Sequence, residues 1–376
     1  MRQQNDFTRR RPISTNRLHD IWFERIWQLR PQERITRLRN LVWLIVGIWA
    51  SKSVHLSKVA GYIPGSATQP SLTRRLERFL DNAAVRIREW YKPLAQRFLQ
   101  SMAATVGEVR LIFDASKVGF HHQLLIIALA YRRRAIPIAW TWSCGSRGHS
   151  SARKQLALLA YVRGLLPSGA SVLVVGDSEF GSIEVLRQLE AWKWRYVLRQ
   201  RGYNLVKVGD QEWRPFGDLI RRPGQSIWLG RGLLTVKHAH PANLWAHWQP
   251  GEEEPWLLVT NLPSQHATRL AYRRRMWIEE MFGDLKGHGF DLESTHLIHF
   301  ERLSRLTLAV ALLYLWLMVT GVHTIQNSLR RLVDRAERRD LSIFQIGLRL
   351  ITRRLTNAQP MSICLSLDHG CKLSGS

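Results

Sequence analysis

Cysteine is scarce in this sequence, which has three, Cys144, Cys364 and Cys371, among 376 residues. They lie far apart or lack CxxC spacing, so neither a disulfide framework nor a zinc ribbon is indicated. Cys364, His369 and Cys371 are near one another in sequence, but three possible ligands on a polar tail more often have no metal role. We therefore predict a reducing compartment and assign these residues no metal.

We also expect no signal peptide and no membrane-spanning helix in this sequence. Residues 1–11 are polar and basic, and no apolar segment of the secretory type follows them. The longest apolar run, 306–322, contains two threonines and a glycine. It falls at or below the roughly 17 to 25 residues that span a bilayer. We predict a buried core helix there, and a cytoplasmic, nucleoid-associated protein without a membrane partner.

Acidic residues are few, with 29 Asp and Glu against 55 Lys and Arg, which gives a formal net charge of +26. This excess is larger than solubility requires. Nucleic acid is the polyanion that fits best, because phosphate contacts from Lys and Arg release condensed counterions. Charge alone leaves a ribosome-associated or membrane-surface protein as an alternative. A hydrophobic content of 45% allows a large core, and the length suggests two or three structural units.

The first hundred residues have a helical pattern. From about residue 13 to 104, apolar residues recur at spacings of three and four between basic residues. Pro64-Gly65-Ser66 interrupts this pattern, and Pro70 and Ser71 suit the start of a new helix. Helices around such a turn can form a helix-turn-helix-like DNA reader, although basic amphipathic helices are usually solvated faces of a bundle. We predict a helical DNA-binding region over residues 1–104.

After this region, the sequence pattern is typical of an α/β sheet. Three β-like segments, 109–119, 123–131 and 135–142, are joined by short links, which favours antiparallel pairing. A helix over 150–166, a buried parallel strand over 171–177, a helix over 183–192 and a strand over 194–200 follow. This order predicts a ribonuclease H-like catalytic core formed by residues 105–202 and 264–298.

The rest of the chain separates into a β-like part and a helical part. Residues 203–263 are rich in tryptophan and read as a β-strand insertion, with strands expected in WRPF, SIWLG, LLTVKHAH and PWLLVTNLP. A helical pattern resumes near His266 and continues to about Thr356. We therefore expect an all-helical C-terminal region over 299–376.

Two aspartates stand out in the predicted core. Asp114 lies among Leu111, Ile112 and Phe113 in a strand, where a carboxylate is costly to bury unless it is paired or binds metal. Asp177 ends the strand SVLVVGD, at the edge where open α/β sheets place their sites. Either residue alone is more simply a turn or helix-cap residue. A third acid is needed before the two aspartates can be interpreted together as a metal site.

That third acid is Glu279, in a segment where Tyr272, Arg275, Glu279 and Lys286 have the spacing Y-x2-R-x3-E-x6-K. At about 100° per residue, one continuous helix would gather these four within an arc of about 60°. Glu280 and Asp284 would then point elsewhere, which makes Glu279 the preferred ligand. The alternative is a solvated basic helix face.

This spacing resembles the YREK signature of the insertion-sequence-four group of bacterial DDE transposases. The resemblance also includes the two strand-borne aspartates, the β insertion before the glutamate helix and the helical regions at both ends. It implies a DNA transposase that cuts the ends of its insertion sequence and transfers the strands into target DNA by cut-and-paste transposition.

The same resemblance implies the roles of the residues. Asp114, Asp177 and Glu279 would coordinate two Mg²⁺ ions, with Mn²⁺ as a possible substitute, for phosphodiester hydrolysis and transesterification. Tyr272, Arg275 and Lys286 would contact DNA phosphates. The partners implied are double-stranded DNA, as terminal inverted repeats and target, and a second copy in a homodimer.

Tryptophans near the glutamate helix of such enzymes can stack on a flipped base, and Trp277 and Trp256 are candidates, although core packing explains most of the 16 tryptophans. Glu179, two residues after Asp177, is a weaker candidate ligand than Glu279. His121 and His122 suit a polar hairpin.

Two other functions stay open at this stage. A ribonuclease H-like nuclease of DNA repair or recombination would cut branched or hybrid substrates without needing terminal repeats. A non-catalytic DNA-binding derivative would show no metal-dependent nicking, and the presence of all three acids argues against it.

Overall fold

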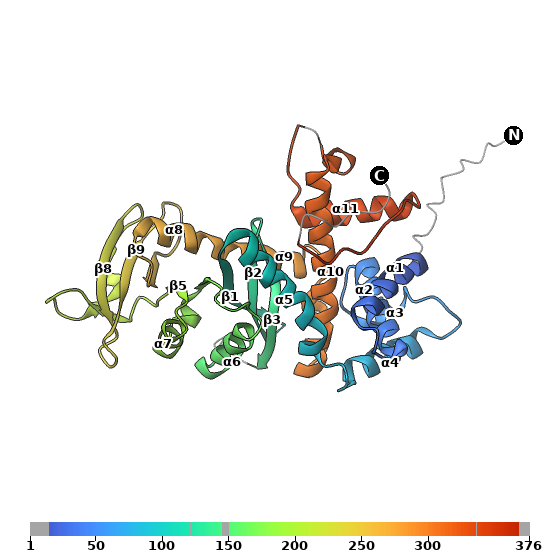
Figure 1. Cartoon of the computed structure of the whole chain (residues 1–376), viewed down its shortest axis with the longest axis horizontal. Helices are drawn as coiled ribbons and strands as arrows, with labels where there is room; N and C mark the ends of the chain where they lie inside the picture. The colour runs from blue at the N-terminus through green and yellow to red at the C-terminus, as the bar shows by residue number, and fades with distance from the viewer. Residues whose placement is uncertain (1–14, 120–121, 145–149, 336, 368–376) are drawn as a thin grey trace. The chain divides into compact units, whose positions relative to one another are not determined.

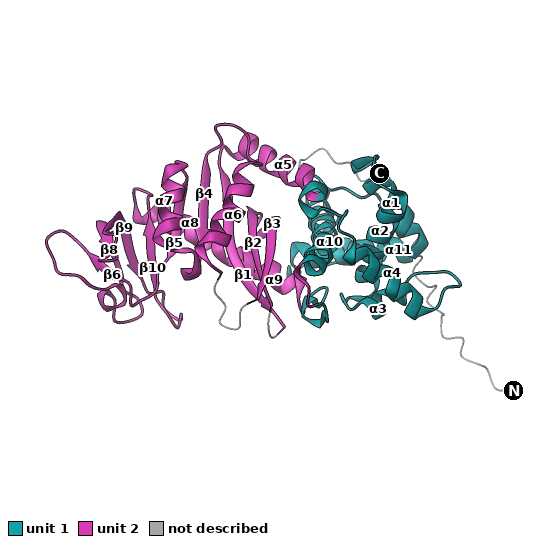
Figure 2. Cartoon of the chain, turned by 90° about the horizontal axis from the view of Figure 1, so that it is seen from below, with its two compact units in different colours: residues 1–90, 287–297, 301–376 teal, residues 91–286, 298–300 magenta. Residues whose placement is uncertain are grey.

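The computed structural model describes the chain except for residues 1–14, 120–121, 145–149, 336 and 368–376. The chain forms two compact units, coloured separately in Figure 2. Unit 1 contains residues 1–90, 287–297 and 301–376, and unit 2 contains residues 91–286 and 298–300. His121, His369 and Cys371 lie outside the described residues.

Helices and strands are labelled in Figure 1. The helices are α1 (Thr15–Leu29), α2 (Ile35–Ser51), α3 (Leu56–Ala60), α4 (Gln69–Asp81), α5 (Ile87–Val106), α6 (Ala152–Arg163), α7 (Ile183–Ala191), α8 (Gln265–Tyr272), α9 (Met276–Leu285), α10 (Phe300–Gln326) and α11 (Ile343–Thr356). The strands are β1 (Val109–Val118), β2 (His122–Tyr131), β3 (Arg134–Cys144), β4 (Val172–Gly176), β5 (Arg195–Arg199), β6 (Leu205–Lys207), β7 (Arg214–Pro215), β8 (Ser226–Leu234), β9 (His240–His247) and β10 (Trp256–Thr260). Short 3₁₀ turns are η1 (Ser178–Phe180), η2 (Phe216–Leu219), η3 (Arg273–Arg275), η4 (Leu292–Ser294) and η5 (Leu329–Leu332).

Unit 2 is a mixed α/β structure around a ten-stranded sheet in the order β3-β2-β1-β4-β5-β10-β9-β8-β6-β7. β1, β2 and β3 pair antiparallel, as their short links predicted. β4 pairs parallel with both β1 and β5, as expected for strands separated by crossover helices. All five residues of β4 are buried, because both faces of this part of the sheet are covered.

The helices of unit 2 cover both faces of the sheet. In Figure 1, α6 and α7 lie beside each other below the strands, and α8 and α9 lie on the opposite side. α8 contacts β4 and β5, and α9 contacts β1, β2 and β3. The helix that carries Glu279 is therefore held against the strand that carries Asp114.

The Trp-rich segment forms strands β6 to β10, which extend the same sheet. β10 pairs antiparallel with β5, and β9 and β8 follow in order. The expectation of one strand in LLTVKHAH is wrong, since β8 ends at Leu234 and β9 begins at His240. Positive φ angles at Thr235 and Ala239, 59° and 42°, turn the chain between them.

Unit 1 is helical, as the periodicity predicted, and α10 is its central core helix. Trp316 of α10 packs edge-to-face on Trp22 of α1, with ring centroids 5.4 Å apart. α10 is long and apolar enough to cross a membrane by length and composition, but 94% of its most apolar window is buried within the protein. The predicted buried core helix is confirmed.

Glycines allow α10 and α11 to approach closely. A Cβ atom at Gly321 would overlap the backbone carbonyl of Ile343, and one at Gly347 would overlap that of Leu317. The backbones therefore touch where a larger residue would separate them.

Candidate active site

Strand register brings the two predicted aspartates together. In the parallel pair of β1 and β4, Phe113 lies opposite Gly176. The next residues along the two chains are Asp114, still within β1, and Asp177, directly after the end of β4, so the two lie at neighbouring positions. They are 63 positions apart in the sequence, and the crossover through α6 makes them neighbours.

Asp114 is enclosed by the sheet and the helix above it. Only 8% of the residue is exposed, and its Oδ1 accepts a hydrogen bond from the backbone N–H of Ala115 at 2.8 Å. The pKa of its carboxyl is raised to about 7, chiefly by burial and also by Asp177 and Glu279, against the opposing effects of Arg275 and the Ala115 N–H. This carboxyl therefore lies in a site that favours a nearby positive charge.

The segment that carries the YREK spacing is not one continuous α-helix. α8 ends at Tyr272, the 3₁₀ turn η3 spans Arg273–Arg275, α9 begins at Met276, and Lys286 follows the end of α9. A 3₁₀ turn rotates each residue by about 120° instead of 100°, so the single helical wheel was wrong across this junction. Arg275 and Glu279 still lie one turn apart on the same side.

Arg275 connects all three predicted acids. Its Nη1 donates to Oε1 of Glu279 at 2.6 Å, and its Nη2 lies 3.7 Å from Oδ2 of Asp114 and 3.6 Å from Oδ2 of Asp177. Burial opposes its charge, but the three carboxylates, Asp114 first, raise its pKa above the usual value. The predicted acids thus converge from β1, the end of β4 and α9 on a single guanidinium.

A second arginine at the site was missed from the sequence. Nη1 of Arg199 lies 3.8 Å from Oδ1 of Asp177, and its Nη2 donates to Glu254 at 2.7 Å. In the parallel register Gly176 lies opposite Leu198, so Asp177 and Arg199 follow at adjacent positions. The signal was present in WRYVLRQ, where an arginine ends a buried strand.

The other residues of the signature occupy different surroundings. Tyr272 is 3% exposed and packs edge-to-face on Trp256 at 5.1 Å. Burial raises the pKa of its phenol. Lys286 donates from Nζ to the backbone carbonyl of Lys117 at 2.8 Å, which ties the end of α9 to β1. Trp277 is half-buried on α9.

The competing acids and His122 make contacts away from Asp114, Asp177 and Glu279, and for Glu280 and Asp284 this agrees with the spacing. Glu280 and Asp284 lie 3.1 and 3.4 Å from Arg134 of β3. Glu179 accepts hydrogen bonds from the backbone N–H and hydroxyl of Ser150, both at 2.6 Å. His122 is hydrogen-bonded to the carbonyl of Ile298 at 3.1 Å.

The three acids offer only carboxylate oxygens, the donors that Mg²⁺ and Mn²⁺ take in proteins. Oδ1 of Asp177 is buried and accepts no hydrogen bond from the described residues. The described residues contain no group of three His, Cys, Asp or Glu arranged closely enough to hold a metal ion. The guanidinium of Arg275 lies among the three carboxylates. The donor set fits a divalent cation, with Arg275 supplying the positive charge here.

Comparison with known families decides the identity. Residues 108–316, more than half of the chain, match the family model described as a transposase DDE domain. The chain belongs to the DDE transposase family. Its match begins just before β1 and extends into α10, so it contains Asp114, Asp177 and Glu279. The protein is a DNA transposase, a nuclease and transesterase by family, whose function is DNA recombination by transposition.

Among solved structures, the transposase is similar to the cryo-EM structure of the piggyBac transposase synaptic complex with hairpin DNA. The identity is 11% and the TM-score 0.40, over 93% of this chain and 82% of the other. No curated protein matches the sequence.

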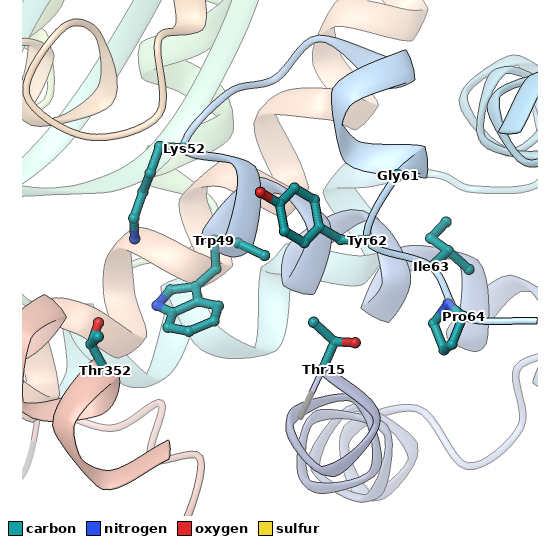
Figure 3. Close-up of a pocket in the computed structure, with 9 residues that line it drawn as sticks. Thr15, Trp49, Lys52, Gly61, Tyr62, Ile63, Pro64 and Thr352 are labelled. Carbon is teal, nitrogen blue, oxygen red and sulfur yellow. The ribbon is translucent and has the colours of Figure 1, made fainter. Parts of the chain in front are cut away.

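The helical unit of the transposase holds a separate cavity of about 560 Å³ (Figure 3). Lys52, Trp49 and Tyr62 line it, and the amine of Lys52 lies 5.0 Å from the centre of the Trp49 ring. The Lys52 residue is exposed overall, yet burial of its amine lowers the pKa of that group to about 8. None of the predicted site residues lies here.

Proposed function

We propose that this transposase is a cut-and-paste enzyme of the insertion-sequence-four, YREK-signature type, with Asp114, Asp177 and Glu279 as its catalytic acids. The observation that carries the proposal is the contact of one guanidinium, that of Arg275, with all three carboxylates at 2.6 to 3.7 Å. Like charges this close repel one another unless a cation lies among them. Such a cluster, with one acid within β1, one directly after the adjacent parallel strand β4 and one on α9, is the arrangement expected of a ribonuclease H-like core.

Asp114, Asp177 and Glu279 would hold the divalent metal, for which Mg²⁺ is the natural candidate. When bound, two such ions activate a water or DNA 3′-hydroxyl and neutralise the leaving oxygen. The lone pairs of Asp177 Oδ1 are available for this because no described residue donates a hydrogen bond to them.

The basic residues would then bind DNA or position the catalytic acids. Arg275 can exchange its contacts with the carboxylates for a bidentate contact with a phosphate near the scissile bond, because guanidinium matches both kinds of oxoanion. Arg199 orients Asp177 from the side of β5. The bond from Lys286 to the carbonyl of Lys117 keeps α9, and Glu279 with it, against β1.

The proposed partners are the terminal inverted repeats of the element, target DNA and a second copy of the chain. Two element ends must be brought together for excision, and a homodimer supplies one active site for each. DNA flanking the gene should carry short inverted repeats bounded by direct duplications.

The test is a cleavage assay on duplex DNA that carries those inverted repeats, with Mg²⁺ added. We expect Asp114→Ala, Asp177→Ala and Glu279→Gln each to reduce cutting by at least about a thousandfold while binding of the ends is retained. Glu280→Gln is the matched control, because Glu280 is the next residue and contacts Arg134 instead.

Retained cutting in any of the three variants removes that residue from the site. Cutting of branched or hybrid substrates without a requirement for the repeats would identify a repair or recombination nuclease instead. Absence of metal-dependent nicking by the unmodified protein would identify a non-catalytic derivative.

A further inference from the structure

A second cavity in unit 1 lies between α2 and α4 and has a volume of about 420 Å³. Its polar lining includes Thr36, Arg37 and Asn40 from α2. From α4 it includes Ser71, Arg75 and Arg78, which lie at spacings of four and three and so share one face of the helix. None of these residues belongs to the active site described above.

Arg75 is a half-buried cation with no counter-ion among the described residues. Its Nε is buried and has no hydrogen-bond partner, and no carboxylate pairs with its guanidinium among the residues that the structure describes. Burial lowers its pKa, and no acid raises it. Burying a charge costs free energy unless a group of opposite charge pairs with it.

The surroundings of Arg75 add positive charge and a hydrogen-bond donor. Arg37 forms an ion pair with Glu33 at 2.7 Å, so Glu33 is not the counter-ion of Arg75. Arg78 is exposed, and its Nε donates to the backbone carbonyl of Arg74. The hydroxyl oxygen of Ser71 accepts from Thr68 at 3.0 Å, which leaves its own proton available to a ligand.

We propose that the cavity between α2 and α4 binds a backbone phosphate of duplex DNA through Arg75 and Arg78, with Ser71 as a neutral donor. The inference rests on the proposed function, since it takes the DNA of the transposition reaction as the ligand. The net charge of +26 favours a polyanion over a small anion.

The contact is with the DNA backbone and not with base edges. The connection between α3 and α4 spans residues 61–68, longer than the roughly three to four residues of a helix-turn-helix. Arg75 is half-buried against α2, so its guanidinium cannot extend into a groove while it stays in this cavity. A phosphate, which protrudes from the duplex, can reach it.

The experiment measures binding of a fluorescent random-sequence duplex of about 30 base pairs, in EDTA, between about 50 and 200 mM salt. Each lost phosphate contact should reduce the slope of log K against log salt by about 0.9. We expect this reduction in Arg75→Gln and in Arg78→Gln, and a preserved slope in Arg75→Lys. Arg86→Gln is the matched control, because Arg86 is an exposed arginine of the same unit that pairs with Glu89 at 3.0 Å.

Thermal melting of each variant separates loss of binding from loss of folding. An unchanged slope in folded Arg75→Gln overturns the proposal. A thermal shift by inorganic phosphate that Arg75→Gln abolishes, with an unchanged DNA slope, would assign the cavity to free phosphate and also overturns it.

The binding assay and the cleavage assay with Mg²⁺ together separate this proposal from the proposed function. Asp114→Ala should keep the full salt slope, because Asp114 contributes to cutting and not to this contact. If Asp114→Ala still cuts but Arg75→Gln loses its slope, the catalytic assignment fails and the phosphate site stands.

Discussion

Glu279 accepts a hydrogen bond from Arg275 at 2.6 Å, one helical turn away, and through this bond the third acid is joined to the two aspartates of the sheet. The guanidinium keeps the carboxylates close without a metal, and it must give up contacts when a metal binds. The guanidinium of Arg275 and a bound metal therefore compete for the same carboxylate oxygens.

Arg275→Ala should therefore destabilise the protein and increase the effect of metal on its stability. Without the guanidinium, the carboxylates repel one another, and we expect a loss of about 1 to 3 kcal/mol in the free energy of unfolding. Added Mg²⁺ should raise the melting temperature more in the variant than in the unmodified protein, because ligand binding to the folded state is stabilising. Thermal melts with and without Mg²⁺ measure both effects, and equal metal shifts in the two proteins would contradict this prediction.

Arg199→Gln should reduce cleavage by about tenfold, which corresponds to about 1.4 kcal/mol in the activation free energy. Arg199 approaches Asp177 at 3.8 Å and also donates to the carbonyl of Pro255 at 3.0 Å. Its loss leaves Asp177 less well oriented but keeps the acid itself. Single-turnover cleavage rates measure the change, and Arg201→Gln, an exchange two residues along the chain, is the control. A loss as large as that of Asp177→Ala would mean that Arg199 contacts the DNA directly.

Asp284 should make stability depend on pH. Burial raises the pKa of its carboxyl to about 7, with Arg134 acting in the opposite direction and Glu280 adding to the rise. Between about pH 4 and pH 7, the unfolded chain has released a proton that the folded protein keeps. The free energy of unfolding therefore falls as pH rises through this window, by at most about 4 kcal/mol from this group.

Asp284→Asn should flatten that dependence and narrow the difference between stability at pH 5 and at pH 8. Urea unfolding at the two pH values measures it. A variant with the same pH dependence as the unmodified protein would show that the ion pair with Arg134 outweighs burial.

Gly321→Ala should destabilise unit 1 by about 1 to 3 kcal/mol, because the added methyl group overlaps the carbonyl of Ile343 and forces α10 and α11 apart. Chemical denaturation measures this loss. Gly287→Ala is the matched control, since nothing lies within 4 Å of a Cβ atom there. A neutral result at Gly321 would mean that the helices separate at little cost.

Lys52 should react with an amine-directed acylating reagent near pH 7.5 faster than a lysine of ordinary pKa. Its lowered pKa, about 8, leaves more of the neutral amine. Mass spectrometry of peptides from briefly labelled protein measures the order of modification. Labelling of Lys52 no faster than the exposed Lys58 would contradict the lowered value.

Much of the sheet could be predicted because local signals agreed with the tertiary arrangement. The meander of β1 to β3 follows from short links, and β4 follows from the fully apolar run before Asp177. The same pairing brings Asp114 and Asp177 to one edge, so their proximity follows from β topology without knowledge of the helices.

What failed depends on geometry that single residues do not encode. The wheel drawn through Tyr272 and Lys286 assumed a uniform helix, and η3 interrupts it. The strand expected in LLTVKHAH is split by a turn whose residues carry no glycine or proline signal. The contact of Arg275 with three acids could not be predicted from spacing, because it depends on how α9 packs against β1.

The pairing of β10 with β5 means that the chain leaves the core after Arg199 and returns beside it, with Leu258 opposite Arg199. Strands β6 to β9 lie between β5 and β10 in the sequence, so this stretch begins and ends at the hydrogen-bonded pair of β5 and β10. Because the ends of this stretch are fixed at β5 and β10, we expect changes in its hairpins to leave the two aspartates in place. We therefore expect this stretch to be where related enzymes differ most in size, and where a foreign domain could be grafted while the cutting chemistry is kept.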